Sequence, residues 1–152
     1  VIDSARKLID NYGKRMVLPT DVAINENGLR RGIPVEELPT EHAVYDIGPD
    51  TLVSYVKKIE RAETIISNGP MGLFENPEFA AGTRETFNAM ANSKGITVVG
   101  GGETTMAFNQ MGLSSKIGHL STGGGSCIAF MSGAIMPALE AMRRSKIRYE
   151  SK

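Results

Sequence analysis

The pattern of apolar and polar positions divides the chain into segments of helical and of strand-like periodicity. Apolar residues recur at helical spacing in three early segments, which predicts helices over 1–12, from a turn at 46–50 to about 62, and from 77 to about 92. The last of these helices has an inner stripe made of Phe79, Thr83, Phe87 and Met90. Helices are also expected after residues 102 and 125, with stops at Gly112 and Gly133, and over 136–144. Short apolar runs predict strands at 16–18, 22–24, 64–67, 96–99 and 117–120, whereas the rest of 20–44 is expected to be a long loop or irregular β structure.

The alternation of strands with helices predicts an α/β fold. Its sheet should be parallel and covered by helices on both faces, in a Rossmann-like three-layer α/β/α arrangement. Ligands bind such sheets at the carboxyl ends of the strands. Glycine-rich loops fall at three such ends, at residues 68–72, 100–102 and 123–125. We therefore expect these loops to form a binding site.

The two triglycine loops have the composition of a phosphate site. Glycine lets the backbone approach a ligand closely, and a helix that starts just after the loop directs free N–H groups and the positive end of its dipole at that ligand. Ser121 and Thr122 before the second loop, and Thr104 and Thr105 after the first, add hydroxyl groups. One such loop would equally fit a tight turn, but two loops at neighbouring strand ends favour the phosphates of a nucleotide.

The sequence lacks the common dinucleotide and P-loop motifs. In the pattern G-x-G-x-x-G, the last glycine is replaced by Thr105 after the first triglycine and by Ile128 after the second, and no G-x-x-x-x-G-K-[ST] occurs. These absences count against a nicotinamide dehydrogenase, a flavin domain and a P-loop NTPase.

The composition excludes several other classes of protein. A chain of 152 residues fits one domain, and equal numbers of basic and acidic residues, 17 of each, argue against a general binder of nucleic acid or membrane surfaces. The single cysteine, Cys127, excludes an internal disulfide and a Cys-rich zinc site, and it suits the reducing cytoplasm. No apolar run approaches the roughly 18–20 residues that a membrane span needs. Because the chain begins at Val1, inside a predicted helix and without methionine, we expect it to be a piece of a longer protein.

Polar residues near the loops leave alternatives open. Glu103 could hold Mg²⁺ on a nucleotide or could only complement the dipole of the helix that follows. Glu75 could accept hydrogen bonds from ribose hydroxyls or could only precede the helix cap at Asn76. His119 has only His42 as a histidine partner, so a structural role is favoured over catalysis or metal binding.

Five short segments add a more specific signal. They are LPTD (18–21), DIGP (46–49), GPMGLFE (69–75), VVGGGET (98–104) and HLSTGGGS (119–126). In their order and approximate spacing, they resemble the signature segments of the phosphoglycerate kinase family. The resemblance covers nearly the whole chain and corresponds to the second part of that family's C-terminal, nucleotide-binding domain. It therefore implies the partial C-terminal domain of a two-domain kinase.

The resemblance implies a role for each loop. Asn68 would lie near the nucleotide phosphates, Glu75 would bind the ribose, and Val44 and Tyr45 would line the adenine pocket. The first phosphate loop would comprise Gly100, Gly101, Gly102 and Thr104. Ser121 and Thr122 would lie beside the nucleotide, and the amides stabilising the transferred phosphoryl group would belong to Gly123, Gly124 and Gly125.

The implied cofactors are ATP or ADP with Mg²⁺. Many members of the family bind the metal through an aspartate, and Glu103 takes that position here. The implied reaction is reversible phosphoryl transfer between 1,3-bisphosphoglycerate and ADP, which gives 3-phosphoglycerate and ATP. The family's acceptor-binding N-terminal domain and its nucleotide-contacting lysines are not in this chain, so the chain alone is expected to be inactive. Residues 1–142 would belong to the nucleotide-binding domain, and the basic tail, 143–152, would dock on the N-terminal domain.

A non-catalytic nucleotide- or anion-binding α/β module of similar topology is the alternative function. Such a module would bind ADP without a partner domain. A Lys- and Arg-rich domain encoded upstream of Val1 would favour the kinase, and a natural start near Val1 would favour the module.

The second triglycine loop supplies a first test. Replacing Gly124 with aspartate is expected to abolish or greatly weaken ATP binding, because a side chain and a negative charge would enter a phosphate site. Calorimetry measures the affinity for ATP, and an unchanged affinity would show that this loop is not part of the binding site.

Overall fold

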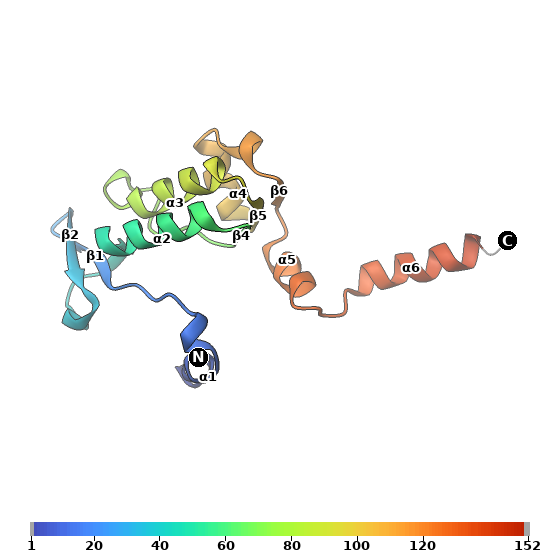
Figure 1. The fold of residues 1–152 in the computed structure, drawn as a ribbon, viewed down its shortest axis with the longest axis horizontal. Coiled ribbons are helices and arrows are strands. Elements are labelled where there is room, and N and C mark those ends of the chain that lie inside the picture. Colours follow the sequence, from blue (N-terminus) through green and yellow to red (C-terminus); the bar gives the residue numbers. More distant parts are fainter. Residues whose placement is uncertain (1, 151–152) are drawn as a thin grey trace.

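The computed structural model describes residues 2–150, so Val1 of the first predicted helix and residues 151–152 of the predicted tail lie outside it. The first half of the chain contains α1 (Ile2–Tyr12), β1 (Asp21–Glu26), β2 (Leu29–Pro34), β3 (Val44–Ile47), α2 (Pro49–Arg61) and β4 (Thr64–Ser67). The second half contains α3 (Ala81–Asn92), β5 (Ile96–Gly100), α4 (Gly102–Gln110), β6 (His119–Ser121), α5 (Gly124–Met131) and α6 (Pro137–Glu150). Figure 1 shows two small sheets, at either end of a body to which α2, α3 and α4 belong.

The second sheet is parallel, as the alternation of strands and helices predicts. Its strand order is β4-β5-β6, and the predicted strands at 64–67 and 96–99 correspond to β4 and β5. The Thr97 hydroxyl of β5 accepts a hydrogen bond from the Gly118 N–H at 2.9 Å, just before β6 begins. Because all three strands run the same way, their carboxyl ends share one edge of the sheet.

One face of this sheet carries the main apolar core. Ile65 of β4 and Val99 of β5 are buried beneath α3 and α4, whose Phe87 and Phe108 rings stack with centroids 3.9 Å apart. The burial of the predicted inner stripe is confirmed, because Phe79, Thr83, Phe87 and Met90 are all at most 2% exposed. The predicted helix from 77 is divided, however: Phe79 lies in a short 3-10 helix (Pro77–Phe79), and α3 begins at Ala81. Burial of these large side chains holds α3 and α4 on the sheet.

Among the described residues, a helix covers the opposite face of this sheet only near the end of β5. Ile66 and Ile96 point to this face and are 51% and 68% exposed. The α5 helix packs at the end of β5, where a Cβ added to Gly100 would lie 3.3 Å from the Cys127 sulfur. In this α/β architecture, α5 therefore forms the helical layer on the second face of the sheet.

Residues 20–44 depart from the predicted long loop. They contain an antiparallel hairpin, and the first sheet has the order β2-β1-β3. The hairpin turns at Asn27 and Gly28, whose φ angles are +54° and +88°. An Asn-Gly pair with both φ angles positive matches the right-handed twist of the flanking strands. The predicted strand at 16–18 is wrong, since no described strand pairs with that segment.

Asp21 joins this hairpin to the N-terminus of α2. Its carboxylate accepts hydrogen bonds from the backbone N–H groups of Asp50 at 3.0 Å and Thr51 at 2.7 Å, and from the Thr51 hydroxyl at 2.6 Å. A Cβ added to Gly48 would lie 2.1 Å from the Asp21 side chain, so the close approach requires glycine there. Asp21 therefore caps a helix that begins 28 residues further along the chain.

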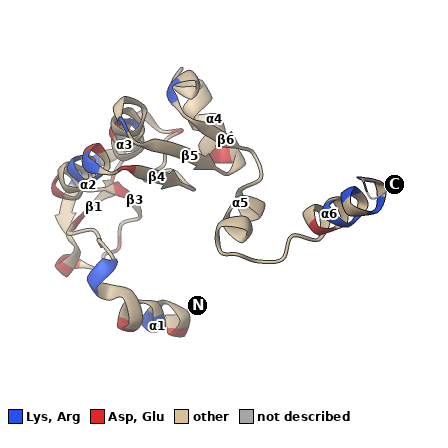
Figure 2. Cartoon of the chain, turned by 45° about the vertical axis from the view of Figure 1, so that its right-hand side comes forward, with Lys and Arg blue, Asp and Glu red and all other residues tan. Residues whose placement is uncertain are grey.

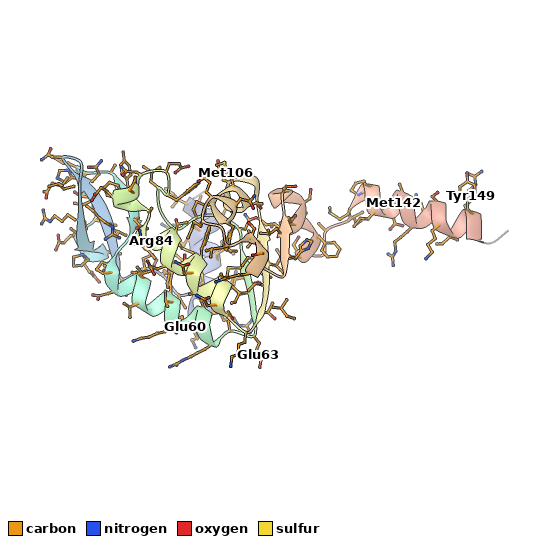
Figure 3. All side chains as sticks on the ribbon, turned by 90° about the horizontal axis from the view of Figure 1, so that it is seen from above. Glu60, Glu63, Arg84, Met106, Met142 and Tyr149 are labelled. Atoms are coloured by element: carbon orange, nitrogen blue, oxygen red, sulfur yellow. The ribbon has the colours of Figure 1, made fainter. Side chains whose placement is uncertain are left out.

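The terminal helices lie apart from this body (Figures 1 and 2). The predicted helix over 1–12 forms α1, but its apolar face is exposed, as at Ile2 and Leu8. The α6 helix extends beyond the predicted 136–144, and Met142 and Tyr149 are exposed along it (Figure 3). Lys and Arg residues lie along its second half (Figure 2). The predicted boundary between residues 142 and 143 falls inside α6 and stays a prediction. Among residues 2–150, no helix combines the length and apolar character that a bilayer span requires.

Asp21 is expected to make stability depend on acid pH. Burial opposes ionisation, but hydrogen bonds from the Thr51 hydroxyl and from the Asp50 and Thr51 amides, with the nearby Arg30 charge, lower the pKa of Asp21 below 3.8. A lowered folded-state pKa contributes stability that is present above the unfolded value and is lost as pH falls through the folded value. Asp21→Asn should therefore reduce the free energy of unfolding by about 1–2 kcal/mol at pH 7, and by progressively less below about pH 4.

Denaturant unfolding between pH 7 and pH 2 measures this difference. Asp50→Asn is the matched control, because it removes one exposed carboxylate at the same helix end. A difference between wild type and Asp21→Asn that does not change with pH would contradict the assignment.

Candidate functional site

The three glycine-rich loops meet at the carboxyl edge of the parallel sheet, as predicted. The Gly101 N–H donates to the Ser121 carbonyl at 3.0 Å, which joins the end of β5 to the end of β6. The Asn68 side chain comes from the end of β4 and lies between the other two loops. A Cβ added to Gly100 would lie 2.9 Å from its Oδ1 atom, and one added to Gly124 would lie 3.3 Å from it.

Gly101 and Gly124 are required by the packing of the two triglycine loops. Gly101 has a φ angle of +107°, which residues with a side chain rarely adopt. A Cβ on Gly124 would lie 2.8 Å from the Gly101 Cα atom. By contrast, a Cβ on Gly102 or Gly125 would meet nothing within 4 Å. The loops are thus packed against each other on one side and open on the other.

Two helices begin at this opening without a side-chain cap. The first is α4, which begins at Gly102, and the second is α5, which begins at Gly124. The residue before each helix is a glycine, so it has no side chain with which to cap the helix. The first intrahelical bonds run from the Thr105 amide to the Gly101 carbonyl and from the Cys127 amide to the Gly123 carbonyl. The amides of residues 102–104 and 124–126 have no intrahelical acceptor and are available to an anion.

The hydroxyl residues at the loops differ in exposure. Thr104 lies in the first turn of α4 and is 2% exposed, so its side chain packs beneath the first loop. Of its polar groups, the backbone N–H is therefore the one that this helix end offers to a ligand. The Thr105 hydroxyl donates to the Ser121 carbonyl at 3.4 Å and thereby also supports the junction of β5 and β6. Thr122 is exposed beside the second loop. Thr122 is therefore better placed than Thr104 to offer a hydroxyl group to a ligand.

The residues present fit Mg²⁺ only together with a ligand that brings oxygen atoms. Within residues 2–150, no group of three or more His, Cys, Asp or Glu side chains could hold a metal ion. Glu103 is exposed in the first turn of α4, next to the open side of the loops. Mg²⁺ is commonly bound by one or two carboxylates together with substrate phosphates and water. The role of Glu103 as a metal ligand stays a prediction.

The expected adenine and ribose residues lie along a second part of the site. Tyr45 of β3 packs edge-on against Phe79, with ring centroids 5.1 Å apart, and its carbonyl accepts from the Leu73 N–H at 2.8 Å. This bond connects β3 to the loop that begins at Asn68 and leads to Glu75. Val44 and Glu75 are both exposed. The loop 68–75 therefore runs from the triglycine loops to Tyr45, and the roles of these residues stay predictions.

Sequence reasoning missed a fully buried carboxylate behind this loop. Asp46 accepts hydrogen bonds from the Gly82 N–H at 2.8 Å, at the start of α3, and from the Arg30 guanidinium at 3.1 Å. Its Oδ1 atom would lie 2.3 Å from a Cβ on Gly72 and 2.1 Å from a Cβ on Gly82. The DIGP segment does not signal these contacts, because the helix that follows it is α2, whereas Asp46 accepts from the start of α3.

Comparison with known proteins identifies the family. The family model described as phosphoglycerate kinase matches residues 1–134. The chain belongs to the phosphoglycerate kinase family. A phosphoglycerate kinase of Methanothermus fervidus is 44% identical over 147 residues, which cover 97% of this chain and 36% of that relative. One of Thermoplasma acidophilum is 43% identical over 150 residues, with coverages of 99% and 36%.

Solved phosphoglycerate kinases share the fold. The crystal structure of the enzyme from Pyrococcus horikoshii matches with a TM-score of 0.87 and 34% identity over 97% of this chain and 37% of that chain. The structure from Coxiella burnetii matches with a TM-score of 0.83 and 30% identity. The chain thus spans about 36% of the length of its phosphoglycerate kinase relatives.

The structure changes which glycine best tests the anion site. A Cβ on Gly124 already collides with Gly101, so loss of binding in Gly124→Asp would not separate charge from packing. Gly125 is open and lies in the first turn of α5, where an acidic residue is compatible with the helix. Gly125→Asp in the full-length protein should weaken ATP binding at least about tenfold more than Gly125→Asn, because only the aspartate repels the terminal phosphate.

Calorimetry measures both affinities, and thermal unfolding checks that the two variants are equally stable. Equal affinities for ATP in the two variants would show that no phosphate approaches this helix end.

Proposed function

We propose that this chain is the nucleotide-binding portion of a phosphoglycerate kinase. The whole protein would catalyse reversible phosphoryl transfer between 1,3-bisphosphoglycerate and ADP, and would produce 3-phosphoglycerate and ATP. The observation that carries this proposal is the pair of uncapped helix N-termini at Gly102 and Gly124, held side by side on the edge where Asn68 lies. Membership of the phosphoglycerate kinase family supports the choice of reaction.

The two triglycine loops would bind different phosphate groups. The first-turn amides of α4 would hold the phosphates of ADP or ATP, and Asn68 would lie near these phosphates. The amides of Gly123, Gly124 and Gly125 would face the phosphoryl group in transfer. Fixed donors aimed at this group stabilise the negative charge of the transition state without having to reorganise.

Glu103 would hold Mg²⁺ together with the nucleotide phosphates. The metal ion, when bound, neutralises phosphate charge during the transfer. The exposed position of Glu103 beside the open side of the loops supports this role.

The far end of the nucleotide would lie along the loop that follows β4. Glu75 would accept hydrogen bonds from ribose hydroxyls, and Val44 and Tyr45 would contact the adenine. The hydrogen bond between the Leu73 N–H and the Tyr45 carbonyl supports this arrangement, because it fixes the end of the loop to β3.

Other parts of the enzyme would lie outside these residues. The acceptor, 3-phosphoglycerate or 1,3-bisphosphoglycerate, would bind to an N-terminal domain that also supplies positive charge, and closure of the two domains would exclude water. Residues 1–142 would form part of the nucleotide-binding domain, and residues 143–152 would dock on the N-terminal domain. A cytoplasmic location and the lack of a nucleic-acid partner are part of the same proposal.

The activity of the full-length protein tests this proposal. It should form ATP from ADP and 1,3-bisphosphoglycerate in the presence of Mg²⁺, and the isolated 152-residue chain should show no turnover, because it lacks the acceptor site. A coupled assay of ATP formation measures both.

Two other results would contradict the proposal in different ways. Binding of ADP without turnover by the full-length protein would favour the non-catalytic nucleotide-binding module. Turnover by the isolated chain would show that the acceptor site lies within these residues.

A further inference from the structure

We infer that Thr83 is a positioning residue of the nucleotide site, which it serves by fixing the loop between Asn68 and Glu75. This inference rests on the proposed function, because it concerns how that site is held in shape. Thr83 lies on α3, behind the loop, and neither the sequence motifs nor the expected nucleotide contacts include it.

The Thr83 hydroxyl bonds to the backbone in the middle of the loop. Its oxygen accepts from the Met71 N–H and from the Gly72 N–H, both at 3.1 Å, and the hydroxyl donates to the Gly72 carbonyl at 3.4 Å. A hydroxyl group has two lone pairs and one hydrogen, so these three bonds use its full capacity. One side chain therefore replaces the strand partners that this stretch of backbone lacks.

The loop has few other anchors of its own. Between Ser67 and Pro77 it forms no helix or strand, and Gly69, with a φ angle of +141°, has open space beside it. Its next fixed point along the chain is the bond from the Leu73 N–H to Tyr45. Asn68 and Glu75 are exposed at the two ends. Without Thr83, more of the ordering of the loop would have to occur on nucleotide binding, and this ordering lowers affinity.

Thr83 is itself held rigidly. It is 1% exposed, it belongs to α3, and the preceding amide, that of Gly82, donates to the buried Asp46 carboxylate at 2.8 Å. A β-branched side chain in a helix has little rotamer freedom. The hydroxyl therefore has a fixed position from which to hold the loop.

The neighbouring Thr86 provides a matched control. It lies on the same helix and is 2% exposed, so it has the same chemistry and the same burial. Its hydroxyl, however, donates only within the helix, to the carbonyls of Gly82 at 2.7 Å and Thr83 at 3.2 Å. Replacement of either threonine with valine removes a buried hydroxyl, but only Thr83→Val releases the loop.

Steady-state kinetics of ATP formation by the full-length protein test the inference. Thr83→Val should raise the KM for ADP about tenfold and leave the KM for 1,3-bisphosphoglycerate unchanged, because two loop amides lose their acceptor. Thr83→Ser keeps the hydroxyl and should stay within about twofold of wild type, and so should Thr86→Val. Hydrogen exchange of segment 68–75, measured by mass spectrometry, should become faster only in Thr83→Val.

The outcomes separate this inference from the proposed function. A wild-type protein that neither binds ADP nor forms ATP would overturn both. An active wild type whose Thr83→Val variant keeps its KM for ADP, or an equal rise in Thr83→Val and Thr86→Val, would overturn the positioning role alone. If thermal unfolding shows that Thr83→Val does not fold, Thr83→Ala is used instead. Its KM for ADP and the hydrogen exchange of segment 68–75 are then compared with those of Thr83→Ser and Thr86→Val, with the same expected outcomes.

Discussion

The backbone of Gly124 lies against the backbone of Gly101, and the geometry of the candidate site depends on this contact. A side chain on Gly124 would come within 2.8 Å of the Gly101 Cα atom, so only glycine allows the loops after β5 and β6 to pack this closely. The hydrogen bond from the Gly101 N–H to the Ser121 carbonyl holds the same junction. Because α4 and α5 start at these loops, the contact also determines how close their free N–H groups lie to each other. One packing constraint thus brings the donors of two helices to one edge of the sheet.

The N-termini of four helices show how the chain keeps this edge available to a ligand. Two of them receive buried carboxylates from distant residues: Asp21 caps α2, and Asp46 accepts from the first turn of α3. The other two, at the starts of α4 and α5, have no side-chain cap. A capping carboxylate there would occupy the amides and repel a phosphate. The distribution of caps therefore separates structural helix ends from those available to an anion.

Much of the fold could be predicted from local patterns. The strand at 64–67, the buried stripe of α3 and the helix stops at Gly112 and Gly133 agree with the structure, and both glycines have positive φ angles. The meeting of the three loops also followed from the sequence, since parallel strands end at a common edge. The hairpin in residues 20–44 was missed, although the Asn27-Gly28 pair is a strong local signal for one. The apolar segment at 16–18 does not pair, because strand formation requires a neighbouring strand as well as suitable residues.

The sequence by itself determined where helices and strands form and which loops carry glycine, because periodicity and turn chemistry act over a few residues. It also determined the family, because each of the five segments that resemble the family's signatures is an unbroken stretch of sequence. Only the tertiary structure decided that Asp46 and Thr83 support the loop 68–75, and that Gly124 is a packing residue whereas Gly125 is open. These roles depend on contacts between residues far apart in the chain or in different elements, and such contacts exist only after helices and strands have packed. Their partners therefore leave no local pattern in the sequence.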